Sequence, residues 1–254
     1  MARRSGGDKI FQNRKEKKDF KRTTNTRTKR DDIIIACEDS VSSPAYLNLI
    51  IKKLKSLRLI TQDSEVIPHD GSTHPTGILN NLKKYKNEHN KGYKDFEHKW
   101  IVIDRDIERV HGGGHTTEDF NNAIRNAKNT RSNLNINVAY ANDSFELWYL
   151  LHFDYRTTAI LRDNILKKVI TELKEINPIK FRTLNKDTIK TKETTQLIFE
   201  ELLPYQNTAI KNAKRLLESR EDVHNPENYN PSTTIHKLVE NLNKFGSTKT
   251  TPLI

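Results

Sequence analysis

From residue 31 onward, short apolar runs alternate with longer segments in which apolar residues recur every three to four positions. The apolar runs predict four strands, at residues 33–37, 65–70, 100–104 and 136–141. The segments between them predict helices over residues 44–57, 76–90 and 117–130. This alternation is typical of parallel strands joined by right-handed crossovers. We therefore predict an α/β fold with a mostly parallel four-stranded sheet flanked by helices, with 65–70 at an edge because it contains Pro68.

The pattern changes after residue 143, where helical periodicity continues and strand-like runs stop. Predicted helices cover residues 145–153, 160–176, 193–203, 208–220 and 232–245. We expect a helical C-terminal region, 144–254, packed on an α/β core of residues 31–143. Ser42 or Ser43 is expected to cap the helix that follows the first strand, with Pro44 in its first turn.

Charge is concentrated at the N-terminus. The chain carries a formal net charge of +11, and residues 1–30 hold twelve Lys and Arg against three Asp and Glu, which accounts for +9 of it. This segment predicts a basic, flexible arm that attracts phosphates without reading sequence, so Arg3 and Arg4 are candidate substrate-binding residues. The alternative is an arm that serves only solubility.

The cysteine count and the hydropathy pattern restrict the compartment. The only cysteine, Cys37, lies inside the first apolar run, so no internal disulfide and no cysteine metal site is available. No apolar stretch approaches the roughly 18 to 20 residues of a membrane span, and the first residues lack the hydrophobic segment of a secretory signal. We predict a reduced, cytoplasmic protein without a membrane partner.

Carboxylates follow two of the predicted strands. Glu38 ends the first strand, and Asp104 and Asp106 end the third, so all three are expected at the carboxyl edge of the sheet, where ligands bind. Alternation along a strand places Asp104 and Asp106 on one side and Arg105 on the other. Oxygen donors of this kind suit Mg²⁺, or Mn²⁺, which also binds substrate phosphates. The alternative for an Asp-x-Asp pair alone is a solvated turn.

Four motifs in order resemble those of RloB-like proteins. They are IIIACE (33–38), VIDRD (102–106), SFELWYLLHF (144–153) and NPSTTIHKLVENL (230–242). The resemblance implies a Toprim-fold protein of bacterial defence loci, a metal-dependent nuclease related to toxins that cut transfer RNA. Carried over by position, Glu38, Asp104 and Asp106 would be its metal and catalytic acids. After CE the family commonly continues with glycine and further acids, whereas this chain continues DSVSSP.

Further candidates lie close to these acids in the chain. Glu146 follows the fourth strand and is a candidate metal ligand, or else it forms a helix-capping pair with Asp143. His111 and His115 flank three glycines, which predicts either a closing segment whose histidines touch substrate or an ordinary flexible connection. Arg105 is a candidate substrate-binding residue.

Cations in the C-terminal region form the last set. Lys211 and Lys214 share a predicted helix, and His236 begins another. Lys211 is a candidate for substrate binding, whereas Lys214 and His236 are candidates for offsetting charge on a reacting phosphate. The alternatives are a solvated helix face and a packed histidine, and it is the family resemblance that favours the catalytic roles.

The acids predict a Mg²⁺-dependent site, and the resemblance implies a Toprim ribonuclease that cleaves transfer RNA in antiphage defence by abortive infection. An ATPase or another defence component is an expected partner, because a cell does not tolerate such an enzyme when it is constantly active. Two alternatives remain open. One is a DNA nickase or nuclease of a defence or restriction locus, and the other is a non-catalytic sensor or adaptor.

Overall fold

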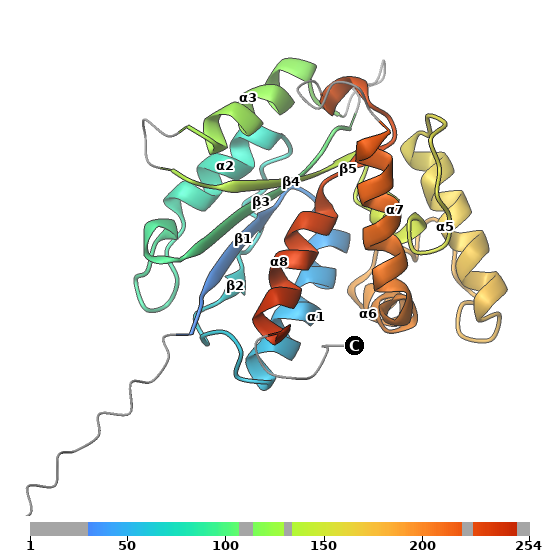
Figure 1. The fold of residues 1–254 in the computed structure, drawn as a ribbon, viewed down its shortest axis with the longest axis horizontal. Helices are drawn as coiled ribbons and strands as arrows, with labels where there is room; N and C mark the ends of the chain where they lie inside the picture. The colour runs from blue at the N-terminus through green and yellow to red at the C-terminus, as the bar shows by residue number, and fades with distance from the viewer. Residues whose placement is uncertain (1–29, 107–113, 130–133, 220–225, 248–254) are drawn as a thin grey trace, which may run out of the picture.

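A five-stranded sheet forms the centre of the computed structural model, which describes residues 30–106, 114–129, 134–219 and 226–247 (Figure 1). In spatial order the strands are β2 (Glu65–Val66), β1 (Ile33–Cys37), β3 (His98–Asp104), β4 (Asn137–Asn142) and β5 (Ser232–Thr233). The first four are parallel, and β5 runs antiparallel to β4. The predicted α/β class with a mostly parallel sheet is confirmed.

Helices cover both faces of the sheet because its strands are apolar on both sides. Alternate residues of β1 and β3 pack against two different clusters. On one face lie α2 (Pro75–Lys84) and α3 (Thr117–Ala127). The other face carries the remaining helices, α1 (Ser42–Ser56), α4 (Glu146–Leu150), α5 (Arg162–Ile176), α6 (Lys192–Leu202), α7 (Gln206–Glu218) and α8 (Ile235–Ser247).

The helical C-terminal region shares its core with the α/β part. Trp148 and Tyr149 of α4 are fully buried in the cluster that also contains residues of β1 and α1. In Figure 1, α8 lies against the strands beside α1, whereas α5 lies farthest from the sheet. No helix among the described residues combines the length and the apolar character that crossing a bilayer requires.

The structure corrects the predicted strand count from four to five. Thr233 and Ser232 pair with Ala141 and Asn142, so the last helix begins at Ile235 rather than at Ser232. A two-residue strand is too short to show alternation in the sequence. It forms because β4 offers an unpaired edge, on which Thr234 N–H donates to Tyr140 O at 2.9 Å.

The predicted cap of α1 is also corrected. Asp39, not Ser42 or Ser43, caps the helix: its carboxylate accepts the N–H groups of Ser43 at 2.8 Å and Val41 at 3.3 Å. Carboxylates near a helix N-terminus satisfy free N–H groups and interact favourably with the helix dipole. The DSVSSP segment is therefore a helix start, with Asp39 in a defined structural role.

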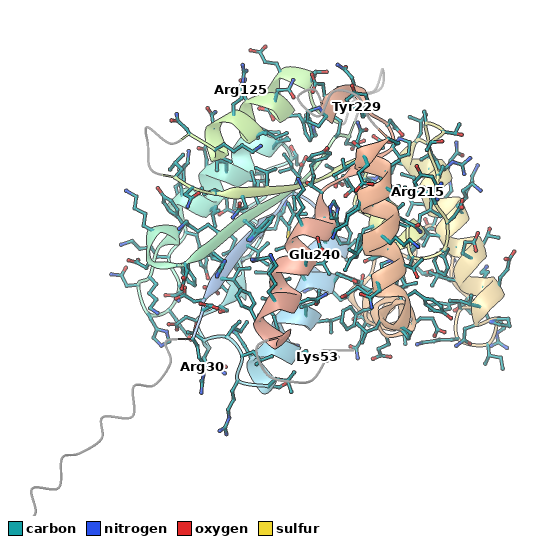
Figure 2. The ribbon with its side chains drawn as sticks, in the orientation of Figure 1. Arg30, Lys53, Arg125, Arg215, Tyr229 and Glu240 are labelled. Carbon is teal, nitrogen blue, oxygen red and sulfur yellow. The ribbon has the colours of Figure 1, made fainter. Side chains whose placement is uncertain are left out.

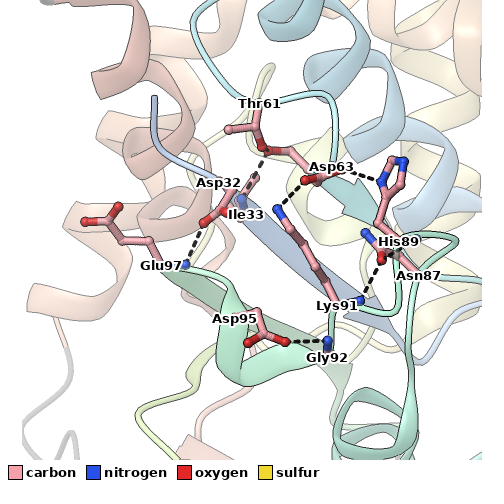
Figure 3. A network of polar contacts seen from close by, with 11 residues as sticks. Asp32, Ile33, Thr61, Asp63, Asn87, His89, Lys91, Gly92, Asp95 and Glu97 are labelled. Atoms are coloured by element: carbon pink, nitrogen blue, oxygen red, sulfur yellow. Dashed lines mark hydrogen bonds and ion pairs between the residues drawn. The ribbon is translucent and has the colours of Figure 1, made fainter. Parts of the chain in front are cut away.

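Carboxylates also tie together the loops at the opposite, amino edge of the sheet (Figure 3). Asp63 is paired with Lys91 and accepts a hydrogen bond from His89 Nδ1 at 2.8 Å. The hydrogen bond from Lys91 lowers the pKa of Asp63. Asp32, which is buried, accepts the Glu97 N–H at 2.7 Å and so fixes the start of β3 beside β1.

We expect Asp32→Ala to lower the free energy of unfolding by about 1–3 kcal/mol, because it leaves the Glu97 N–H without its acceptor. Asp32→Asn keeps an oxygen at the same position and should lose clearly less stability than Asp32→Ala. Urea unfolding at neutral pH, followed by circular dichroism, measures the difference. Equal losses in the two variants would contradict this role of the hydrogen bond.

Candidate metal centre

Glu38 and Asp104 meet at the carboxyl edge because β1 and β3 are adjacent parallel strands. Their register pairs Cys37 with Val102, and the Glu38 N–H extends the ladder by donating to Val102 O at 2.9 Å. The Asp104 N–H donates in turn to Glu38 Oε2 at 3.0 Å, across 66 residues of sequence. The predicted convergence of these two acids is therefore observed.

Asp104 lies at the centre of an excess of negative charge. Its side chain is buried, and burial raises its pKa well above the usual range. The charges of Glu38, Glu146 and Asp39 raise it further, and Arg162 opposes them. Such a carboxylate is costly to keep ionised unless a cation binds beside it.

The surroundings of Glu38 both raise and lower the pKa of its carboxyl group. Burial raises its pKa, whereas His115, whose Nδ1 lies 3.3 Å from Glu38 Oε1, lowers it. The Asp104 N–H also lowers it. His115 is itself buried and stacks on Phe120 of α3, so its position beside Glu38 is set by packing. His115 therefore lies beside one of the acids, and its contact with substrate stays a prediction.

Asp106 lies beyond the end of β3 and is held by the helical region. Its Oδ2 lies 2.8 Å from Arg162 Nη1, at the first residue of α5. The Arg162 N–H donates to Asp143 Oδ2 at 2.7 Å, so Asp143 binds the start of α5. The predicted capping pair of Asp143 with Glu146 is therefore wrong, since Asp143 serves a different helix.

Glu146 is buried and surrounded by donors. Its Oε1 accepts from Ser42 Oγ at 3.0 Å and lies 3.1 Å from Lys190 Nζ, while its Oε2 accepts from Ser144 Oγ at 2.8 Å. Although burial opposes it, Lys190 and Arg162 together with Ser144 lower the pKa of Glu146. In this arrangement Glu146 holds Lys190 at the site, and a role as metal ligand would require Lys190 to move.

The donor set fits a hard divalent cation. Glu38 and Asp104 offer carboxylate oxygens, which Mg²⁺ prefers, and burial together with neighbouring acids raises the pKa of both groups. In the described part of the chain, the one group of three candidate ligands whose atoms all lie within 4.8 Å of one another is elsewhere, at Asp31, Glu97 and His98 on the amino edge. Glu38 and Asp104 thus form a two-carboxylate site.

Two predicted catalytic cations lie apart from these acids. Lys214 on α7 forms an ion pair at 2.6 Å with Glu240. Figure 2 labels Glu240 on α8. His236 is buried, and burial lowers its pKa to about 4, so its ring is neutral at neutral pH. Burial therefore disfavours a charged His236, and the Lys214–Glu240 pair links α7 to α8.

The predicted substrate-binding residues are scattered. Arg105 is buried, and its Nη2 donates to Thr117 Oγ1 at 2.5 Å, so it does not present its charge to solvent as expected. Lys211 is exposed on α7. Arg3, Arg4 and His111 lie outside the described residues.

Arg162 and Lys190 are the site residues that sequence reasoning missed. Each is one of 44 Lys and Arg in the chain, and neither belongs to a local motif. Arg162 reaches Asp106 across 56 residues, and Lys190 comes from the loop before α6. Only the packing of the helical region on the sheet brings them to the carboxylates.

Fold and site together define an α/β protein with an acidic cluster at the carboxyl edge of a mostly parallel sheet. Cations from the helical region form ion pairs with two of these acids. Residues 33–242 match the family described as RloB-like protein, and the chain belongs to this family. The comparisons with curated proteins and with solved structures gave no match.

Removing the central charge should stabilise the metal-free protein. We expect Asp104→Asn to raise the free energy of unfolding by about 0.5–2 kcal/mol in EDTA, because it relieves repulsion in a buried acidic cluster. Mg²⁺ should then raise the melting temperature of the wild type and not of this variant. Exposed Asp154→Asn is the control. A less stable Asp104→Asn protein would contradict the charge excess.

Breaking the Glu146–Lys190 pair should destabilise the fold in a pH-dependent manner. We expect Lys190→Met to cost about 1.5–3 kcal/mol at pH 7, the range for hydrogen bonds to charged groups. A lowered pKa in the folded state stabilises above the unfolded pKa, near 4.5, and this contribution is lost as the pH falls through the folded value. The deficit should therefore shrink below about pH 4.5.

Unfolding curves at pH 7 and pH 4 test this, with Lys186→Met as the matched control from the same loop. Lys186 is exposed, so its substitution should be nearly neutral at both values. A deficit for Lys190→Met that is independent of pH would assign the effect to packing alone.

Proposed function

We propose that the protein is a metal-dependent phosphodiesterase that cleaves RNA, with transfer RNA as the preferred substrate. The observation that carries the proposal is the meeting of Glu38 and Asp104 at adjacent strand ends, inside a buried cluster with too little positive charge. The resemblance of the motifs to RloB-like, Toprim-fold nucleases supports the same reaction class. Membership of the family is consistent with it.

In this proposal Glu38 and Asp104 hold the metal, and Asp106 lies nearby in an ion pair with Arg162. Bound Mg²⁺ would supply charge stabilisation at the phosphoryl oxygens and a more acidic water. The chain itself orients the carboxylates: the Asp104 N–H binds Glu38 Oε2, and His115 lies against Glu38 Oε1. Arg162 and Lys190 bring positive charge to the site, where it favours a developing negative charge on the phosphate.

The charge of the chain favours a nucleic acid as substrate. Residues 1–30 carry +9 of the net +11, which suits electrostatic attraction to a phosphate backbone. The choice of transfer RNA over other RNA, a role in antiviral defence by abortive infection, and control by an ATPase or similar partner rest on the family resemblance. A cytoplasmic location agrees with the single, buried cysteine.

A second candidate is a non-catalytic sensor or adaptor. The observation that favours it is the internal neutralisation of two acids, with Asp106 paired to Arg162 and Glu146 paired to Lys190. An acidic cluster balanced by the protein's own cations can persist as a structural feature without metal. Calorimetric titration with Mg²⁺ and Mn²⁺ separates the two, since the adaptor should bind neither ion.

Purified protein should cleave total cellular RNA in Mg²⁺ and not in EDTA, and a transfer RNA fraction should be cut preferentially. We expect Glu38→Gln and Asp104→Asn each to reduce the rate at least about 100-fold, because each removes a charged group at the reacting phosphate. Lys168→Gln on the exposed face of α5 is the control and should retain the wild-type rate.

A supercoiled plasmid incubated under the same conditions tests the DNA alternative. Nicking that depends on Asp104, together with intact RNA, would move the proposal to a DNA nuclease. RNA cleavage that survives both substitutions would assign the activity to another site or to a contaminant.

A further inference from the structure

A groove is lined by residues that follow Glu38 in the chain and by His69, whose ring contacts the Glu38 carbonyl. It has a volume of about 620 Å³ and lies between the β1–α1 connection, the segment after β2 and the start of α6. We name it the Lys52–Lys192 groove. Its lining includes Val41, Pro44, Leu49, Lys52, Pro68 and Lys192.

The groove combines an apolar surface with positive charge. Lys52 on α1 and Lys192 at the start of α6 are both exposed, and neither forms an ion pair with a described residue. None of the described residues that line the groove is an Asp or a Glu. Pro44, Leu49 and Pro68 provide apolar surface between the lysines and the strand ends. Apolar surface with a few cations suits a base attached to phosphates.

Hydrogen bonds hold the groove wall next to the acids. The Gly71 N–H donates to His69 Nδ1 at 2.9 Å, so His69 Nε2 carries the proton and donates to the Glu38 carbonyl at 2.9 Å. The ring of this lining residue therefore links the backbone at Gly71 to the backbone at Glu38. On the other wall, Asp39 binds the N–H groups of Val41 and Ser43. These hydrogen bonds fix the position of the groove wall relative to Glu38.

The dimensions of the groove favour a single strand. Its volume falls within the roughly 300–1,000 Å³ of sites that enclose small molecules, which accommodates a nucleotide and not a duplex. Proteins that recognise unpaired RNA bind splayed bases on apolar or aromatic surfaces and the phosphates on cations. Charge complementarity to a phosphate backbone is provided by Lys52 and Lys192.

We propose that the Lys52–Lys192 groove binds an unpaired nucleotide of RNA next to the phosphate positioned at Glu38 and Asp104. The base packs on Pro44, Leu49 and Pro68, and the flanking phosphates contact Lys52 and Lys192. This inference rests on the proposed function for its choice of RNA. It assigns the groove as the site that selects single-stranded over paired substrate.

Binding of a fluorescein-labelled ten-residue oligouridylate to the full chain tests the groove without catalysis. Fluorescence anisotropy in EDTA at several salt concentrations gives the affinity and its salt slope. We expect Lys52→Glu combined with Lys192→Glu to weaken binding at least tenfold and to reduce the slope by about 1.4, which corresponds to two lost phosphate contacts on a single strand. Lys168→Glu with Lys186→Glu, exposed and outside the groove lining, should stay within about twofold of the wild type.

Two further measurements decide the remaining alternatives. A 4-thiouridine version of the oligonucleotide should cross-link to peptides containing residues 40–52, 66–69 or 192–196. A ten-base-pair RNA duplex should bind the wild type and the groove variant equally. Equal losses for duplex and single strand would overturn the selection of unpaired RNA.

The inference and the proposed function fail in different ways. Unchanged oligouridylate binding by the groove variant, with RNA cleavage by the wild type intact, would overturn the groove alone. Groove-dependent binding by a protein that cleaves no RNA would overturn the nuclease alone and leave the binding site standing. Circular dichroism and an unchanged melting temperature confirm that the groove variant is folded.

Discussion

The hydrogen bond from the Asp104 N–H to the Glu38 carboxylate is the contact on which the site depends. It exists because β1 and β3 are neighbouring parallel strands that end at the same edge. The bond orients the Glu38 carboxylate in a buried setting, where the charge of Glu38 adds to the burial that raises the pKa of Asp104. A divalent cation would lower the cost of ionising Asp104, and this effect is the physical basis of the proposed metal-binding role.

The helical C-terminal region completes the site rather than lying beside it. Arg162 at the start of α5 and Lys190 before α6 place two cations against Asp106 and Glu146. They limit the repulsion in the metal-free protein and bring positive charge to the place where a phosphate would bind. The same packing forms the Lys52–Lys192 groove, since α6 supplies one wall. Charge balance and substrate access therefore depend on one tertiary arrangement.

Sequence reasoning succeeded where the signal is local and failed where it comes from distant contacts. The strands at 33–37 and 100–104 are continuous apolar runs, so their burial and the acids that follow them could be predicted. Lys84 ends α2 earlier than the predicted residue 90, because the chain turns into a bridge between Lys86 and Gly92. His236 looked like a source of charge, but burial makes it neutral at neutral pH.

The amino-acid sequence alone predicts the α/β class, the family, and the delivery of Glu38 and Asp104 to one sheet edge, because each apolar run and the acid that follows it are neighbours in the chain. Which cations meet those acids, and the addition of β5 to β4, depend on tertiary packing. These contacts join segments far apart in the chain, as do Arg162 and Asp106 across 56 residues. They follow from how the helices pack on the sheet, and no local pattern records that packing.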